Sequence, residues 1–75
     1  MMTLLDSKRG EKVRVVKINA DHQLKQRLIS FGVMKGVIVE VLTYAPGKKT
    51  IEIKVAKMRL ALRDEEAKYI EVETL

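Results

Sequence analysis

The chain has 75 residues, of which 47% are hydrophobic and 33% charged, and its 15 Lys and Arg against 10 Asp and Glu give a formal net charge of +5. This length predicts one domain over residues 1–75 that buries only about 60% of its unfolded surface, and the mixture of charges argues against disorder. Because the chain has no cysteine, a disulfide framework, a thiolate metal site and a cysteine nucleophile are excluded.

The apolar runs of the sequence are too short to cross a bilayer. Even the run Phe31-Gly32-Val33-Met34 has four residues, whereas a membrane-spanning helix needs about 20. The N-terminal segment 1–6 has no basic region and meets a charge at Asp6, so it does not resemble a secretory signal. We therefore predict a cytoplasmic protein that does not insert into a membrane.

The first predicted element is a strand. Val13, Val15, Val16 and Ile18 form a β-branched run that is typical of a mostly buried strand. We expect this strand to end near Asn19.

An amphipathic helix is predicted next. Asp21 can cap its first turn, and Gly32 can supply the left-handed residue that ends it. Between them, Leu24, Leu28 and Phe31 recur at i, i+4 and i+7 and form one apolar stripe. We expect this stripe to seat the helix on the sheet.

Three more strands follow with a period of two. Residues 37–42 alternate between two faces, as do residues 51–55 and residues 58–63. Between the first two, Ala45-Pro46-Gly47-Lys48 suits a type II turn, because Pro fixes the first central φ and Gly accepts the positive second one. This pattern predicts a hairpin.

The C-terminal part predicts one helical turn over residues 64–67, with its acids at the favourable end, and a last short strand containing Ile70 and Val72. The predicted order is β, α, β, β, β, helical turn, β. Because about five short strands in so few residues must curl to cover their apolar face, we predict an all-β fold with one short helix, in which the strands curl into a small barrel.

The metal-ligand inventory is small. His22 is the sole histidine, so one chain cannot assemble a histidine-based metal cluster. Asp21, His22 and either Met1 or Met2 could hold a transition metal loosely or across a dimer, but this ligand set is unspecific. We predict no resident cofactor and no identifiable metal site.

No catalytic motif is present either. Ser7 and Ser30 have no plausible base near them in the sequence, and the pair Glu65-Glu66 is explained by helix-end electrostatics. Met34 and Met58 stand where core-filling side chains are expected. We therefore predict a protein that is not an enzyme.

Nucleic-acid binding is one alternative, because small basic barrels often bind RNA or DNA. The sequence has just three aromatic residues, Phe31, Tyr44 and Tyr69, and no basic strand interleaves them as a stacking platform requires. We do not expect nucleic acid to be the partner.

A series of short segments resembles the FeoA family over residues 3–72. These segments are Leu4 before Gly10, the strand from Val15 to Ile18, Arg27-Leu28 before Phe31-Gly32, Gly36, Val39, Val41, Ala45-Pro46, Leu60-Ala61-Leu62-Arg63 with Glu66-Ala67, and Ile70-Glu71-Val72. The resemblance implies an SH3-like barrel that accompanies FeoB, a membrane ferrous iron transporter with a cytoplasmic GTP-binding domain. FeoA-like domains also resemble the C-terminal barrel of metal-dependent repressors, which implies a metal-responsive dimerising domain as a further alternative.

The chain departs from the family pattern in two ways. Lys57 stands where the family usually has Gly, and a left-handed backbone there would cost about 1–2 kcal/mol, so we expect this hairpin turn to differ. The net charge of +5 is the second departure. An acidic partner, anionic lipid or simple solubility would each explain it.

We predict that the barrel docks on the cytoplasmic part of a FeoB-like transporter. Its contacts are expected where a small barrel leaves apolar or charged groups uncovered. The candidate residues are Arg27, Ile29, Met34, Tyr44, Ala45 and Pro46. For Arg27, a solvated helix face is the alternative.

Overall fold

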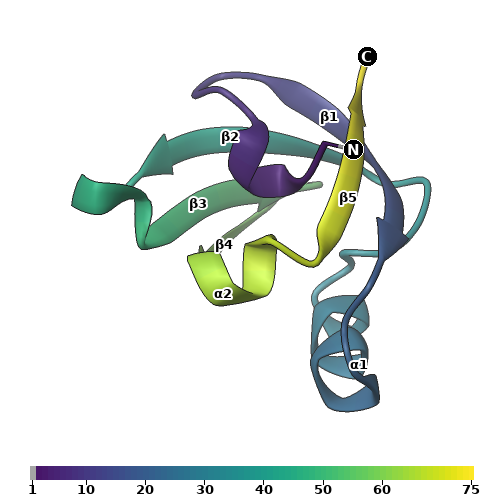
Figure 1. The fold of residues 1–75 in the computed structure, drawn as a ribbon. Helices are drawn as coiled ribbons and strands as arrows, with labels where there is room; N and C mark the ends of the chain where they lie inside the picture. Colours follow the sequence, from purple (N-terminus) through teal and green to yellow (C-terminus); the bar gives the residue numbers. More distant parts are fainter. Residues whose placement is uncertain (1) are drawn as a thin grey trace.

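The structure, a computed structural model, describes residues 2–75, so the metal-ligand candidate Met1 lies outside the described residues. Its elements are η1 (Leu4–Asp6), β1 (Lys12–Ile18), α1 (His22–Ser30), β2 (Ile38–Tyr44), η2 (Pro46–Lys48), β3 (Thr50–Val55), β4 (Met58–Arg63), α2 (Asp64–Ala67) and β5 (Ile70–Thr74) (Figure 1). The predicted order of strands and helices is confirmed. The short turn η1 was not predicted.

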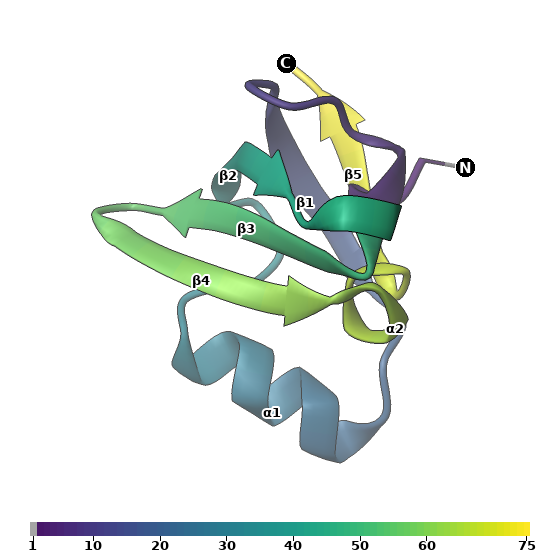
Figure 2. The ribbon, with the colours of Figure 1, turned by 90° about the vertical axis from the view of Figure 1, so that its left-hand side faces the viewer.

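The strands form one antiparallel sheet in the order β4-β3-β2-β1-β5. The sheet curls around its inner face, as the two perpendicular views show (Figures 1 and 2). Within residues 2–75, β4 pairs with β3 and β5 pairs with β1, so the two edge strands do not close the barrel by pairing with each other. The predicted small SH3-like fold of five strands is confirmed, in an open form.

Two bulges, one in β1 and one in β2, bend the sheet. In β1, Val15 pairs with Val72 and Lys17 with Glu71, which leaves Val16 as an extra residue. Such a residue turns its side chain away from the regular alternation, and Val16 is 38% exposed. The predicted strand is therefore buried at Val13, Val15 and Ile18 but not at Val16, because the bulge interrupts the period of two.

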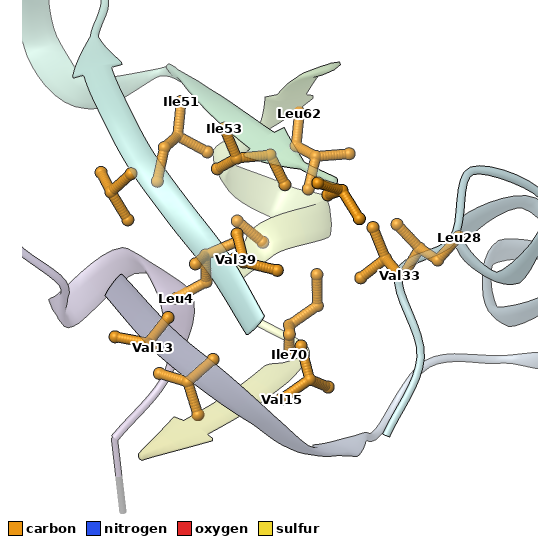
Figure 3. Packing of buried hydrophobic residues seen from close by; sticks show 14 of the residues in the cluster. Leu4, Val13, Val15, Leu28, Val33, Val39, Ile51, Ile53, Leu62 and Ile70 are labelled. Carbon is orange, nitrogen blue, oxygen red and sulfur yellow. The ribbon is translucent and has the colours of Figure 1, made fainter. Parts of the chain in front are cut away.

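The core fills the concave side of the sheet. Side chains from all five strands point toward one another, and Leu4 of η1, Leu28 of α1 and Val33 join them (Figure 3). The buried apolar residues are Leu4, Val13, Val15, Ile18, Leu28, Val33, Val39, Val41, Ile51, Ile53, Val55, Leu62, Ala67, Ile70 and Val72. The helix thus supplies one fully buried side chain to a core made mainly by strands.

Both predicted ends of α1 are confirmed. Asp21 Oδ1 accepts a hydrogen bond from the Leu24 amide at 2.8 Å. Gly32 has φ +87°, and its amide donates to the Ile29 carbonyl at 2.9 Å, while the next amide, that of Val33, donates to the Leu28 carbonyl at 2.9 Å. These two bonds are the Schellman arrangement, which reverses the chain after the helix.

The apolar stripe of α1 is shorter than predicted. Leu28 is fully buried and Leu24 packs partly against the core, but Phe31 is only half-buried and lies outside the core cluster. The reason is that the helix ends at Ser30, so Phe31 takes a C-cap conformation (φ −92°, ψ 2°) and does not continue the stripe.

The two methionines predicted as core fillers are exposed instead. Met34 is 40% exposed and Met58 is 44% exposed. Met34 follows the chain reversal at Gly32, outside any regular element, and Met58 begins the edge strand β4, which has a neighbour on one side only. The expectation that both methionines fill the core is therefore wrong, whereas the exposure of Met34 agrees with its place among the candidate contact residues.

The left-handed residue of the β3–β4 turn is Ala56 (φ 56°), one position before Lys57. Because a side chain at positive φ is strained, Ala56→Gly should raise the free energy of unfolding by about 0.5–1 kcal/mol. As a control, Ala61→Gly in the middle of β4 should lower it by a similar amount, about 0.5–1 kcal/mol. Urea unfolding measures both, and a less stable Ala56→Gly variant would contradict this explanation.

Candidate partner-binding surface

A groove of about 650 Å³ lies between the end of β1, the helix α1 and the segment that follows the helix. Three elements build it: the bulge turns Val16 outward, α1 presents Lys25 and Ile29, and the reversal at Gly32 brings the next residues back beside the helix. Its lining residues are Val16, Lys17, Ile18, Lys25, Ile29, Met34, Lys35 and Glu71.

The groove is lined by both apolar and basic side chains, which form what we call its apolar floor and its basic rim. Val16, Ile29 and Met34 supply apolar surface that the core does not cover. The rim carries Lys17, Lys25 and Lys35 against the single carboxylate of Glu71, a net charge of +2 from three lysines less one glutamate. This combination suits a partner with both apolar and acidic groups.

A second hollow, of about 580 Å³, lies on the other side of α1 and is more polar. There Arg27 forms an ion pair with Glu66 at 2.5 Å, and the side chain of Glu66 is only 12% exposed. The other oxygen of that carboxylate, Oε1, accepts from the Arg63 amide at 3.0 Å. Arg27 therefore ties α1 to α2, which is a structural role that the sequence analysis did not predict.

Tyr44 is also held by contacts within the chain. Its hydroxyl donates to the Ser7 carbonyl, and Lys48 Nζ lies 5.0 Å from the centre of its ring. Burial, with the neighbouring carboxylates of Asp6 and Glu11, raises the pKa of Tyr44 above its ordinary value of 10.0. Tyr44 thus fastens the N-terminal turn η1 to the end of β2.

Tyr44→Phe should lower the free energy of unfolding at neutral pH by about 1–2 kcal/mol, because the buried carbonyl loses its donor. The unfolded chain releases the phenolic proton at lower pH than the folded chain, so the wild type loses stability as pH rises above about 10. The variant has no hydroxyl at position 44, so it does not lose stability through this titration. Urea unfolding at pH 7 and about pH 10.5 should show that the difference in free energy of unfolding between the wild type and Tyr44→Phe becomes smaller at the higher pH. The control is Tyr69→Phe, because Tyr69 is exposed. A gap that stays constant or widens would contradict the assignment.

The structure does not bring the six predicted contact residues together. Ile29 and Met34 share the groove, and Arg27 lies in the second hollow. The turn at Tyr44-Ala45-Pro46 is at the opposite end of the molecule, beside η2 (Figures 1 and 2). Ala45 accepts from the Lys48 amide at 2.9 Å and Gly47 has φ 79°, which confirms the predicted type II geometry.

No metal centre is assembled within residues 2–75, where no group of three or more His, Cys, Asp or Glu side chains could hold an ion. His22 is exposed at the first position of α1, next to Asp21, whose carboxylate is occupied by the helix cap. Over the same residues, none of the helices has the length and apolar character needed to span a bilayer.

The family model described as "FeoA domain" matches residues 2–74. The chain belongs to the FeoA family. A Helicobacter pylori protein named "Putative Fe(2+) transport protein A" is 37% identical over 70 residues, which cover 92% of this chain and 92% of that protein. Membership of the FeoA family implies a role in Fe(2+) transport.

Solved structures support the FeoA assignment. The solution structure of the FeoA protein from Chlorobium tepidum has a TM-score of 0.93 at 32% identity and covers 99% of this chain and 70% of its own. The apo form of the manganese-activated repressor ScaR has a TM-score of 0.87 at 20% identity, over 99% of this FeoA chain and 35% of the repressor. At that identity the second likeness concerns the fold alone.

Of the residues that line the FeoA groove, Ile29 and Met34 were predicted from the sequence and the others were missed. Val16, Lys25 and Lys35 come from three separate elements, and their proximity depends on a bulge and a helix reversal. One signal was available: the adjacent pair Val15-Val16 breaks the period of two within the first strand, which is typical of a bulge. The two lysines have no signal beyond the positive charge of the chain.

Proposed function

We propose that this FeoA chain is a non-enzymatic, cytoplasmic accessory protein that docks reversibly on the cytoplasmic GTP-binding part of a FeoB-like transporter and so modulates uptake or GTP turnover. The observation that supports it most is the groove beside α1, an uncovered apolar surface with a basic rim on a chain of an iron-transport family. Concave apolar surface of this kind is typical of a binding site.

Ile29 and Met34 are the contacts on which this proposal chiefly depends. Met34 is 40% exposed, Ile29 is half-buried, and neither belongs to the core. Arg27 and Tyr44 already have partners within the chain, so they contribute less to docking than predicted. The turn at Ala45-Pro46 would be a second and separate contact.

The hydrogen bonding of the two serine hydroxyls, Ser7 and Ser30, supports a binding function rather than a serine-based catalytic one. Ser30 Oγ donates to the Arg27 carbonyl at 2.6 Å, within its own helix. Ser7 is 2% exposed, and its Oγ has no hydrogen-bond partner among the residues described. Within residues 2–75, neither serine hydroxyl is hydrogen-bonded to a side-chain base, the contact by which a serine nucleophile is activated.

The test is a calorimetric titration of the purified protein with the cytoplasmic GTP-binding part of the transporter. We expect saturable binding, and a change in the rate of GTP hydrolysis in a parallel assay. Single-stranded and duplex nucleic acid at two salt concentrations, and ferrous and zinc ions, are titrated alongside. Binding to nucleic acid alone with a steep salt dependence, or dimerisation on metal alone, would overturn the proposal in favour of one of the two alternative functions.

A further inference from the structure

The groove beside α1 combines an apolar floor with lysines that form no ion pair within residues 2–75. We infer that it binds an acidic segment of the partner protein that inserts an apolar side chain between Val16, Ile29 and Met34. This inference rests on the proposed docking function and names the chemistry of the segment that docks.

The floor is suited to receive one apolar side chain. Val16 is 38% exposed because it is the extra residue of the β1 bulge, and bulges re-aim side chains at functional surfaces. Met34 also lines the groove and is 40% exposed, and its flexible thioether adapts to the shape of an inserted group. Ile29, which is half-buried, adds a third apolar side chain from α1.

The rim favours carboxylates. Within residues 2–75 the ion pairs are Arg14–Glu73, Arg27–Glu66, Arg59–Glu52 and Arg63–Glu65, so none involves a lysine of the groove. Lys17 lies opposite Glu71 in the β1–β5 register, but the carboxylate of Glu71 accepts from the side-chain amide of Asn19. Lys25 and Lys35 are therefore the charges most available to an acidic partner.

The geometry favours a protein segment over a membrane or a nucleic acid. Basic clusters bind anionic bilayers by charge, whereas this groove of about 650 Å³ combines three lysines with a hollow that an apolar side chain of a protein can fill. Single-stranded nucleic acid is bound on aromatic side chains on which its bases stack, and the lining residues include none. An acidic segment with one apolar anchor satisfies both the rim and the floor.

The test compares two variants of equal net charge. Lys25→Glu/Lys35→Glu reverses two rim charges, and Lys49→Glu/Lys57→Glu reverses two exposed charges outside the groove. At about 50 mM salt, where screening is weak, the rim variant should bind the transporter's cytoplasmic part at least about tenfold more weakly than the wild type. The control variant should differ by less than about threefold, and the gap between the variants should shrink at about 500 mM salt.

Circular dichroism and urea unfolding first confirm that both variants fold. Equal weakening in the two variants, or no weakening in the rim variant, would overturn the acidic-segment inference and leave the docking function standing. Absence of binding by the wild type would overturn the docking function itself, and this inference with it. Binding of the same variants to vesicles that contain phosphatidylserine is measured as well. If the rim variant loses binding to vesicles but still binds the transporter, the groove binds a membrane and the inference is overturned.

Discussion

Leu28→Ala should lower the free energy of unfolding by about 2–5 kcal/mol, the range for truncating a buried leucine. Leu28 is fully buried and is the one side chain of α1 in the buried core. In Figure 3 it lies beside Val33, at the end of the core that the helix closes. Since small domains have a total stability of about 5–15 kcal/mol, this one change should remove a large fraction of it.

Ile29→Ala is the matched control, because Ile29 is the next residue of the same helix and lies outside the core. We expect it to cost less than about 1 kcal/mol. Urea unfolding followed by circular dichroism measures both variants. If the two substitutions cost the same, the helix is not seated by Leu28, and the described packing of α1 is wrong.

Met34→Asp should weaken binding to the transporter's cytoplasmic part by about 30- to 150-fold, which corresponds to about 2–3 kcal/mol. The carboxylate would have to lose its water beside the apolar floor of the groove, where an apolar anchor is expected to sit. Because Met34 is 40% exposed in the free protein, its replacement should change the free energy of unfolding by less than about 0.5 kcal/mol. The loss would therefore report binding rather than folding.

Met58→Asp is the control for this substitution. Met58 is similarly exposed, at 44%, but it begins the edge strand β4 and does not line the groove. Calorimetry should find its affinity within about threefold of the wild type. A strong loss in Met58→Asp and none in Met34→Asp would move the docking surface to the β4 edge.

Local patterns predicted most of the fold because they depend on neighbours in sequence. The period of two placed the hairpin strands, and the chemistry of Asp21, Gly32 and Gly47 placed the helix ends and the turn, all of which the structure confirms. Val16 and Phe31 were misplaced for local reasons. Val16 is the extra residue of the β1 bulge, and Phe31 follows the last residue of α1. Neither feature changes the amino-acid composition of its segment.

The candidate site was less predictable because it depends on contacts between distant residues. Arg27 pairs with Glu66, 39 positions away, and Tyr44 donates to Ser7, 37 positions away. A single sequence contains no sign of either contact, so both residues had the appearance of free surface groups. The exposure of Met34 depends in the same way on the chain reversal at Gly32, and hydrophobicity alone predicted it to be buried.

The most direct test of the docking proposal is to titrate the ¹⁵N-labelled protein with the unlabelled cytoplasmic GTP-binding part of a FeoB-like transporter and to follow the amide signals by NMR. We predict saturable changes centred on the groove, at Val16, Lys17, Lys25, Ile29, Met34 and Lys35, with the β4 edge unaffected. Saturable changes centred on another surface, or no changes at all, would contradict the assignment of the groove as the docking site.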